Sequence, residues 1–327
     1  MDSTGSESTG GDNVSGNAFG MDLGASSRTS LEAVKATVTA VGGNITGMVS
    51  AGSNLYAAAY ASGVEASQAN LATGAASFTV TGQGGKVSGS AASAEARVCG
   101  VEARGGTTAI GGDLALTITA AGGTVAGSGE LALAYADAYG VNIENADDAH
   151  LGSLIVNGTI SGSVMAQGGT AKRASIDSID SAYAPNSYGS AYGITNNGAT
   201  LQADGASLTV TAVGGTATNS FLKTVGASAG ADAYGINTSG PHTTSITGAT
   251  KLTVQATGGT ATTKTVDADK PSDAYADANA YGVKNDNTYE QTSSGVTAST
   301  LTLGSLAAEV AATAGNAQDV NYPSENS

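Results

Sequence analysis

Residues 207–236 read SLTVTAVGGTATNSFLKTVGASAGADAYGI, and both halves of this stretch recur along the chain. In the first half, Leu208 and Val210 alternate with threonines before a glycine pair, which is the period-2 pattern of a strand with one buried face. In the second half, alanines alternate with polar and aromatic residues up to Gly235. We therefore expect two strands, one with Leu and Val inward and one with only methyl groups inward, each followed by a glycine at a corner.

A glycine closes each strand-like segment, and successive glycines are about 22 residues apart. The series is Gly20, Gly42, Gly63, Gly84, Gly100, Gly122, Gly140, Gly168, Gly193, Gly214, Gly235, Gly258, Gly282 and Gly304. Gly-Gly and Ala-Tyr-Gly types alternate almost strictly. The sequence thus predicts an all-β fold, a parallel β-helix (β-solenoid) of about 22-residue half-repeats paired into about 44-residue repeats.

This pattern leaves two coil lengths open. With about 22 residues in one coil, a Leu/Val layer stacks on an Ala layer along the axis. With about 44 residues, the Leu/Val strand faces the Ala strand across a thin, flat core. We favour the 22-residue coil, which gives a rod on the order of 60 Å long at ~4.8 Å per strand.

The repeats predict one β-solenoid domain over residues 17–312. We expect residues 1–16 to be a disordered lead and residues 313–327 a disordered tail, because both are polar and lack the repeat pattern. Near the end of the domain, residues 305–314 fit a short capping helix by propensity and also align with the strand pattern, so both forms stay open.

Bulky side chains are scarce, since 327 residues include no Trp, three Phe and 48 Gly. Fixing one backbone residue costs roughly 1–2 kcal/mol and burying a Val or Leu returns about 1.5–3 kcal/mol, so such a chain folds only if nearly every residue joins a hydrogen-bond ladder. The formal charge of -15 argues against nucleic acid and anionic membrane surfaces, which attract Lys and Arg. A single cysteine, Cys99, excludes an internal disulfide framework.

The sequence carries neither a secretory-signal pattern nor a transmembrane pattern. Residues after Met1 are acidic and polar rather than basic and then apolar. The longest uncharged apolar run, residues 114–129, is shorter than the ~20 residues of a membrane span and is interrupted by glycines. We expect no membrane insertion by this chain, and an exported protein would have its signal removed or outside this sequence.

Steps such as ADAYGV, GSAYGI and ADAYGI resemble those of the Gly/Ala/Thr-rich passenger regions of bacterial autotransporters and related surface adhesins. The resemblance covers roughly residues 17–312. It implies a right-handed parallel β-helix at the cell surface or outside the cell, acting as an adhesin or filament. The chain shows neither the signal segment nor the C-terminal membrane barrel of a complete autotransporter, so a fragment or a separately secreted filament or matrix protein also fits.

An aromatic residue precedes most glycines of the Ala-Tyr-Gly type. These residues are Phe19, Tyr139, Tyr192, Tyr234 and Tyr281. Ser62 and Cys99 interrupt the column. Because rings offer rigid contact area at low entropic cost, the column predicts a stacking strip for glycans or another partner. The alternative is an ordinary ladder of rings on the solenoid exterior.

Outward Thr-x-Thr pairs recur on alternate layers of the expected coil. They are Thr37/Thr39, Thr79/Thr81, Thr117/Thr119 and Thr209/Thr211. The pairs resemble the flat Thr arrays of ice-binding solenoids, although Thr is also a favoured outward strand residue. The series fails at Ser163/Met165 and at Gln255.

Acidic residues occur in Ala-Asp-Ala contexts and in inserted segments. They are Asp137, Asp232, Asp277, Glu144, Asp147, Asp148, Asp177, Asp180, Asp267, Asp269 and Asp273. Loop carboxylates are ligands for Ca²⁺, but no stretch matches an EF-hand or a GGxGxD repeat, so we expect solvated loops and no cofactor, with Ca²⁺ as a weaker alternative. A GxSxG match at residues 226–230 lies inside an alternating strand, and His150 and His242 show no ligand spacing. We therefore predict no catalytic residue.

These patterns together predict a non-enzymatic extracellular or cell-surface element, structural or adhesive, that presents repeated Thr, Asp and Tyr side chains. The expected partner-binding residues are Tyr139, Tyr192, Tyr234, Tyr281, Thr209 and Thr211. The expected partner is a second copy stacked end to end, or a host or environmental glycan or protein. An ice-binding solenoid and, with less support, a β-helix polysaccharide-active enzyme are the alternatives.

Overall fold

The structure is a computed structural model of residues 1–327. It describes residues 2–4, 8–9, 13–46, 55–147, 150–173, 184–220, 226–241, 243–265, 273–286 and 299–321. Within these ranges every element of regular secondary structure is a β-strand, and the strands pair in parallel. The predicted all-β class is confirmed. In the same ranges, no helix has the length and apolar character needed to cross a membrane.

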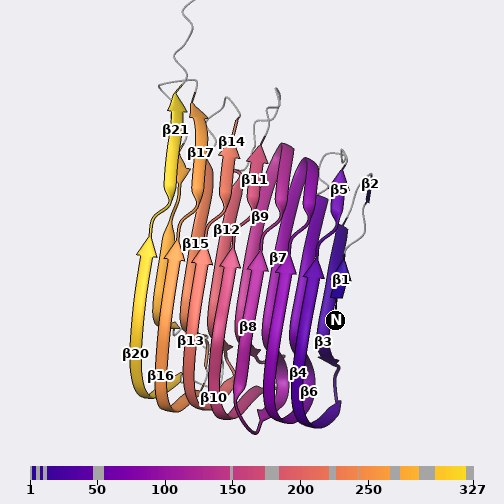
Figure 1. Ribbon diagram of the computed structural model, residues 1–327, viewed down its shortest axis with the longest axis vertical. Coiled ribbons are helices and arrows are strands. Elements are labelled where there is room, and N and C mark those ends of the chain that lie inside the picture. Colours follow the sequence, from indigo (N-terminus) through magenta and orange to yellow (C-terminus); the bar gives the residue numbers. More distant parts are fainter. Residues whose placement is uncertain are drawn as a thin grey trace, which may run out of the picture.

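Every passage of the chain repeats one path, which we call a unit (Figure 1). A first-layer strand turns into a second-layer strand, which runs to a glycine pair and continues as a short third strand. First-layer strands are β3 (Asn13–Leu23), β12 (Asn186–Asn197), β15 (Ala227–Ser239), β18 (Ala274–Tyr275) and β19 (Ala278–Asp286). Second-layer strands are β4 (Arg28–Val41), β8 (Leu114–Ala121), β10 (Gly152–Gln167), β13 (Thr200–Val213), β16 (Thr243–Thr257) and β20 (Thr300–Thr313).

The remaining strands extend this scheme. The third strands are β2 (Ser8–Thr9), β5 (Asn44–Thr46), β11 (Thr170–Arg173), β14 (Thr216–Asn219), β17 (Thr260–Thr265) and β21 (Asn316–Asn321). Strand β6 (Leu55–Gln83) joins a first-layer to a second-layer position, while β7 (Lys86–Ile110) and β9 (Thr124–Glu144) begin as third strands and continue into the first layer. Strand β1 (Asp2–Thr4) pairs with the end of β4.

The pairing register shows that like stacks on like. Val210 in β13 pairs with Val164 in β10 and with Val254 in β16, so partners are about 44 residues apart in this region. Tyr192 likewise pairs with Tyr234. The favoured pairing at about 22 residues is therefore wrong, because in these ladders a Leu/Val strand lies beside another Leu/Val strand and an Ala strand beside another Ala strand. The Leu/Val strand faces the Ala strand of its own unit instead.

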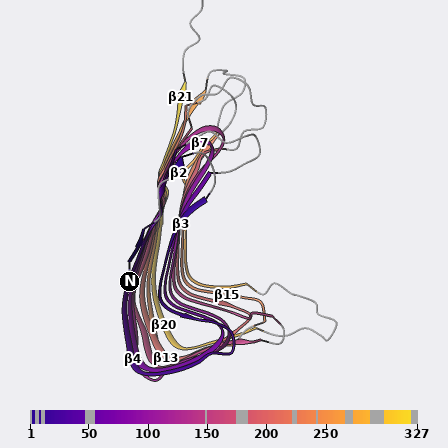
Figure 2. The ribbon, with the colours of Figure 1, turned by 90° about the vertical axis from the view of Figure 1, so that its right-hand side faces the viewer.

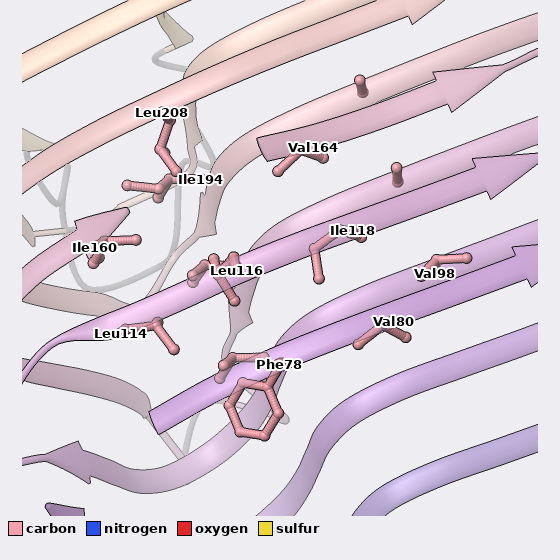
Figure 3. Close-up of a cluster of buried hydrophobic side chains, with 14 of the residues drawn as sticks. Phe78, Val80, Val98, Leu114, Leu116, Ile118, Ile160, Val164, Ile194 and Leu208 are labelled. Atoms are coloured by element: carbon pink, nitrogen blue, oxygen red, sulfur yellow. The ribbon is translucent and has the colours of Figure 1, made fainter. Parts of the chain in front are cut away.

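The predicted inward and outward faces are confirmed. Val210 and Ala231 are 0% and 1% exposed, whereas their neighbours Thr209 and Asp232 are accessible to solvent. Figure 3 shows how side chains of facing layers fill the space between them, with Val80 near Val98. A core built from so many alanines is thin, so the layers lie close together.

Each glycine pair forms a waist between two parts of this core. The larger part lies between the first and second layers, and a smaller part lies between the third strands and the beginning of the first layer. At the waist, Gly259 N–H donates to the Ala229 carbonyl oxygen at 3.0 Å, and Gly315 N–H donates to that of Ala276 at 2.9 Å. The two layers thus touch backbone to backbone, which Figure 2 shows as a narrowing of the outline.

The sequence predicted that the glycine of the Ala-Tyr-Gly type ends its strand. In the structure this glycine lies inside the strand. Gly235 is within β15, and both Gly235 and Ile236 are buried, which breaks the in-out alternation. A Cβ at Gly235 would lie 2.9 Å from Leu252 Cδ1 in the facing layer. The layer that contains β15 bends sharply in Figure 2, and an inward residue without a side chain permits that bend.

Parts of the predicted lead and tail are ordered strands. Residues 13–16 begin β3, residues 2–4 and 8–9 form β1 and β2, and residues 316–321 form β21. The proposed capping helix at residues 305–314 is also replaced, because β20 extends to Thr313 and pairs with β16. The other residues of the lead and tail lie outside the described ranges, and one domain over residues 17–312 stays a prediction.

Candidate functional site

The four tyrosines of the predicted strip form one stacked column on the outer side of the first layer. Tyr139 pairs with Tyr192, Tyr192 with Tyr234, and Tyr234 with Tyr281. Their ring centroids are 4.8, 4.9 and 5.0 Å apart, and the ring planes differ by 5°, 2° and 8°. The structure thus brings these four predicted residues together.

Stacking at this distance covers the ring faces. No ligand ring fits between two tyrosines, and each stacked pair contributes about 0.5–1.5 kcal/mol beyond its area burial. Burial raises the pKa of Tyr139 and of Tyr192, so their hydroxyl groups stay protonated. Along most of its length the column is therefore a stabilising ladder, and it can offer a ring face to a partner only where it ends.

One end of the column is Tyr281, whose side chain is 39% exposed. The Lys284 ammonium nitrogen lies 5.6 Å from the Tyr234 ring centroid and 5.7 Å from that of Tyr281. It also forms an ion pair with Asp286 at 2.8 Å. A cation therefore lies beside both terminal rings of the column.

At the other end the column passes two positions that have no ring. Phe19 pairs with Ser62, Ser62 with Cys99, and Cys99 with Tyr139. The guanidinium carbon of Arg97 lies over the Tyr139 ring, 5.6 Å from its centroid. The interruption of the ring column that the sequence predicted at Ser62 and Cys99 is therefore present in the structure, and the Arg97 side chain partly fills it.

A cavity of about 230 Å³ lies at this interruption. Its lining includes Phe19, Tyr60, Ser62, Glu65, Arg97 and Cys99. Ser62 and Cys99 are each 3% exposed, and the Ser62 hydroxyl donates a hydrogen bond to the Val64 carbonyl oxygen at 2.8 Å. Burial raises the pKa of the Cys99 thiol well above its usual range, so the thiol is not a nucleophile at neutral pH.

Two arginines share one buried carboxylate beside the cavity. Arg97 Nη2 and Arg104 Nη2 lie 3.2 Å and 2.9 Å from the same Glu102 oxygen, Oε1, and Arg104 Nε lies 2.5 Å from Glu144 Oε1. Among the described residues, no ion pair includes Glu65. Burial, followed by the nearby Glu102 charge, raises the pKa of Glu65. Glu65 is thus an acceptor without an ion-pair partner beside the cavity.

Asp137 lies in the strand β9, as expected for the alternating Ala-Asp-Ala steps, and not in a loop. It pairs in register with Arg97 on one side and with Ser190 on the other. Burial and the nearby Glu95 raise the pKa of Asp137 to about 6, against the opposing effects of a Ser190 hydrogen bond and Arg97. Asp232 is also in a strand, β15.

Thr209 and Thr211, the two threonines of the predicted partner-binding surface, lie away from the tyrosine column, on the outer face of the second layer. Thr209 pairs with Ser163 and Thr253, and Thr211 pairs with Met165 and Gln255. Complete Thr-x-Thr pairs occupy three consecutive units, not alternate layers. These pairs are Thr37/Thr39, Thr79/Thr81 and Thr117/Thr119. The register thus places three of the four predicted Thr-x-Thr pairs side by side in the N-terminal half of the chain.

The predicted calcium ligands do not gather into a centre within the described ranges. There, no group of three or more His, Cys, Asp or Glu side chains is close enough to hold a metal ion. Asp147 instead contacts His150, with 2.7 Å between Asp147 Oδ1 and His150 Nδ1. The remaining residues of that prediction lie outside the described ranges, namely Asp148, Asp177, Asp180, Asp267 and Asp269, as does His242.

Comparison of this chain with protein-family models, with curated proteins and with solved structures gave no match.

The cluster of Tyr60, Arg97, Glu102 and Arg104 was not predicted. Arg97, Glu102 and Arg104 are close together in β7, and the register places Tyr60 of β6 beside Arg97, so that the four residues line one cavity. One signal was available, because residues 97–100 read RVCG where the corresponding residues 137–140 read DAYG. Three changes in one step of the series, at Arg97, Val98 and Cys99, indicate a site with its own requirements.

Proposed function

We propose that the chain is a non-enzymatic β-solenoid with about 44 residues in each coil, which acts as a structural or adhesive element outside the cell or on its surface. A coil corresponds to one unit of the fold. The parallel register and the repeated side-chain columns support the solenoid. The observation that carries the function is an exposed apolar edge at the last coil.

Residues of β20 are exposed where their partners in the preceding coil are buried. Val310 is 44% exposed and its partner Val254 is 0% exposed, while Leu306 is 49% exposed and its partner Thr250 is 1% exposed. On its outer side, β20 pairs with no strand of the described residues. Such an edge is a template for another parallel strand.

We take the occupant of this edge to be the first coil of a second copy. In the part of the chain that the structure describes, the first coil also has a largely open edge, since β1 pairs with the last three residues of β4 and Leu31 in β4 is 39% exposed. In β4 Val38 is buried, and in β20 Val310 pairs with the buried Val254, so both edges place a valine on the inner face. End-to-end stacking would bury apolar side chains on both sides and build a filament.

A filament of this kind would bind weakly at each coil and strongly as a whole. The tyrosine and threonine columns repeat at the spacing of the coils, so contacts to a repetitive glycan or protein surface add through multivalency. Enzymatic activity has less support, because the Glu102 carboxylate beside the cavity is neutralised by Arg97 and Arg104.

The stacking is tested with the variant Leu306→Lys/Val310→Lys, because lysine on an edge strand blocks edge-to-edge pairing. The wild type is expected to show a mass that rises with concentration in light scattering, and rods longer than one chain in electron microscopy. The lysine variant is expected to remain a monomer. The control Thr209→Lys/Thr211→Lys adds the same charge on an outer face and should behave as wild type. A wild type that is strictly monomeric at high concentration contradicts the proposal.

Ice binding is a second candidate, favoured by the three consecutive Thr-x-Thr pairs in β4, β6 and β8. If these pairs bind ice, the wild type shows thermal hysteresis, and Thr79→Tyr/Thr81→Tyr in the middle pair removes at least half of it. Met165→Tyr, at a position where the series is already broken, should leave it unchanged. Absence of hysteresis in the wild type excludes this function.

A further inference from the structure

The aromatic column has a vacancy that is one ring thick. Phe19 and Tyr139 are three rungs apart in register, which is about 14 Å at ~4.8 Å per rung. The Arg97 guanidinium already occupies the plane next to Tyr139, at 5.6 Å. About 9 Å then remains between the rung of Phe19 and the guanidinium, which is two stacking distances and leaves space for one flat ring.

The chemistry around this vacancy favours an aromatic ring. Its two ends are a phenyl ring and a planar guanidinium, both of which stack on a flat π-system. The cavity of about 230 Å³ suits a single ring with small substituents. Glu65 is a wall of the cavity and is without an ion-pair partner among the described residues, so it can accept a hydrogen bond from the edge of the ring.

We propose that this vacancy, defined by Phe19, Ser62, Glu65 and Arg97, is a binding site for one aromatic ring that carries an N–H or O–H donor, such as the indole or phenol group of a partner. The bound ring stacks between Phe19 and Arg97 and donates to Glu65. It thereby restores one missing ring of the column. The site is remote from β20 at the other end of the chain and does not depend on end-to-end stacking.

Free indole is the probe, because the chain has no Trp and indole fluorescence therefore reports the ligand alone. Saturable one-to-one binding is expected, with a dissociation constant on the order of 1 mM for so small a ligand. Ser62→Tyr supplies the missing ring from the protein itself, so affinity for indole should fall at least tenfold. Thr117→Tyr adds the same ring on the outer face of the second layer and should bind indole as the wild type does.

Each outcome of the indole experiment either supports or overturns the proposed site. Lack of saturable indole binding by the wild type overturns the proposal, as does equal binding by Ser62→Tyr. If circular dichroism shows that Ser62→Tyr does not fold, the variant Phe19→Leu tests the site instead. Loss of the stacking face should lower its affinity for indole at least threefold. An unchanged affinity overturns the proposal. Binding of glucose in place of indole also overturns it. None of these readouts measures filament formation.

Discussion

Replacement of Gly215 by alanine is expected to destabilise the protein by about 3 kcal/mol, the upper part of the range for overpacked cores. A Cβ at Gly215 would overlap the carbonyl oxygen of Gly169 in the preceding unit and the hydroxyl of Ser187 in the facing layer. Neither atom can move far. The carbonyl oxygen accepts the N–H of Thr216 at 2.9 Å, and the hydroxyl donates to that same carbonyl at 2.7 Å.

Denaturant unfolding followed by circular dichroism measures this loss, and Gly24→Ala is the matched control. A Cβ at Gly24 would meet no heavy atom within 4 Å. Its substitution should change stability by no more than about 0.5 kcal/mol, or raise it slightly by restricting the unfolded chain. Equal stability of the two variants would show that the waist is not packed as described.

Deletion of one whole unit, residues 200–242, is expected to leave a folded protein. Thr200 pairs in register with Thr243, so Thr243 takes the place of Thr200 after Ala199. Each column of stacked side chains then becomes one residue shorter. In the shortened chain Tyr192 would stack on Tyr281, because both are partners of Tyr234 in the native register. Strand content per residue, measured by far-ultraviolet circular dichroism, should not change.

Deletion of half that length, residues 215–235, is the matched comparison and is expected to abolish cooperative folding of the units that follow. It would join the second-layer strand β13 directly to the end of the first-layer strand β15, so the chain would have no segment in which to reverse its direction. Limited proteolysis should cleave this variant rapidly and spare the whole-unit deletion. A coil of about 22 residues predicts that both deletions are tolerated, because they remove two coils and one coil, so the 215–235 deletion distinguishes the two coil lengths.

The candidate site was only partly predictable. The tyrosine column followed from a repeated motif, since residues at equivalent positions of successive repeats lie in one line. That its rings stack face to face, and so hide their faces, depends on the register and on side-chain orientation. The cavity near Arg97 depends on pairings between β3, β6 and β7, which bring together residues about 40 positions apart in the sequence.

The sequence by itself determined which side chains of the long repeated strands face inward, because period-2 alternation is a local property of one strand. Leu208 and Ala231 were both assigned correctly for that reason. It did not determine which strands lie beside each other, because the Leu/Val and the Ala halves alternate in the same way and either stacking satisfies the pattern. Only the tertiary structure decided this. Gly215 fits against the carbonyl oxygen of Gly169, a contact that no residue with a Cβ can make, so this glycine pair stacks on the glycine pair 46 residues before it.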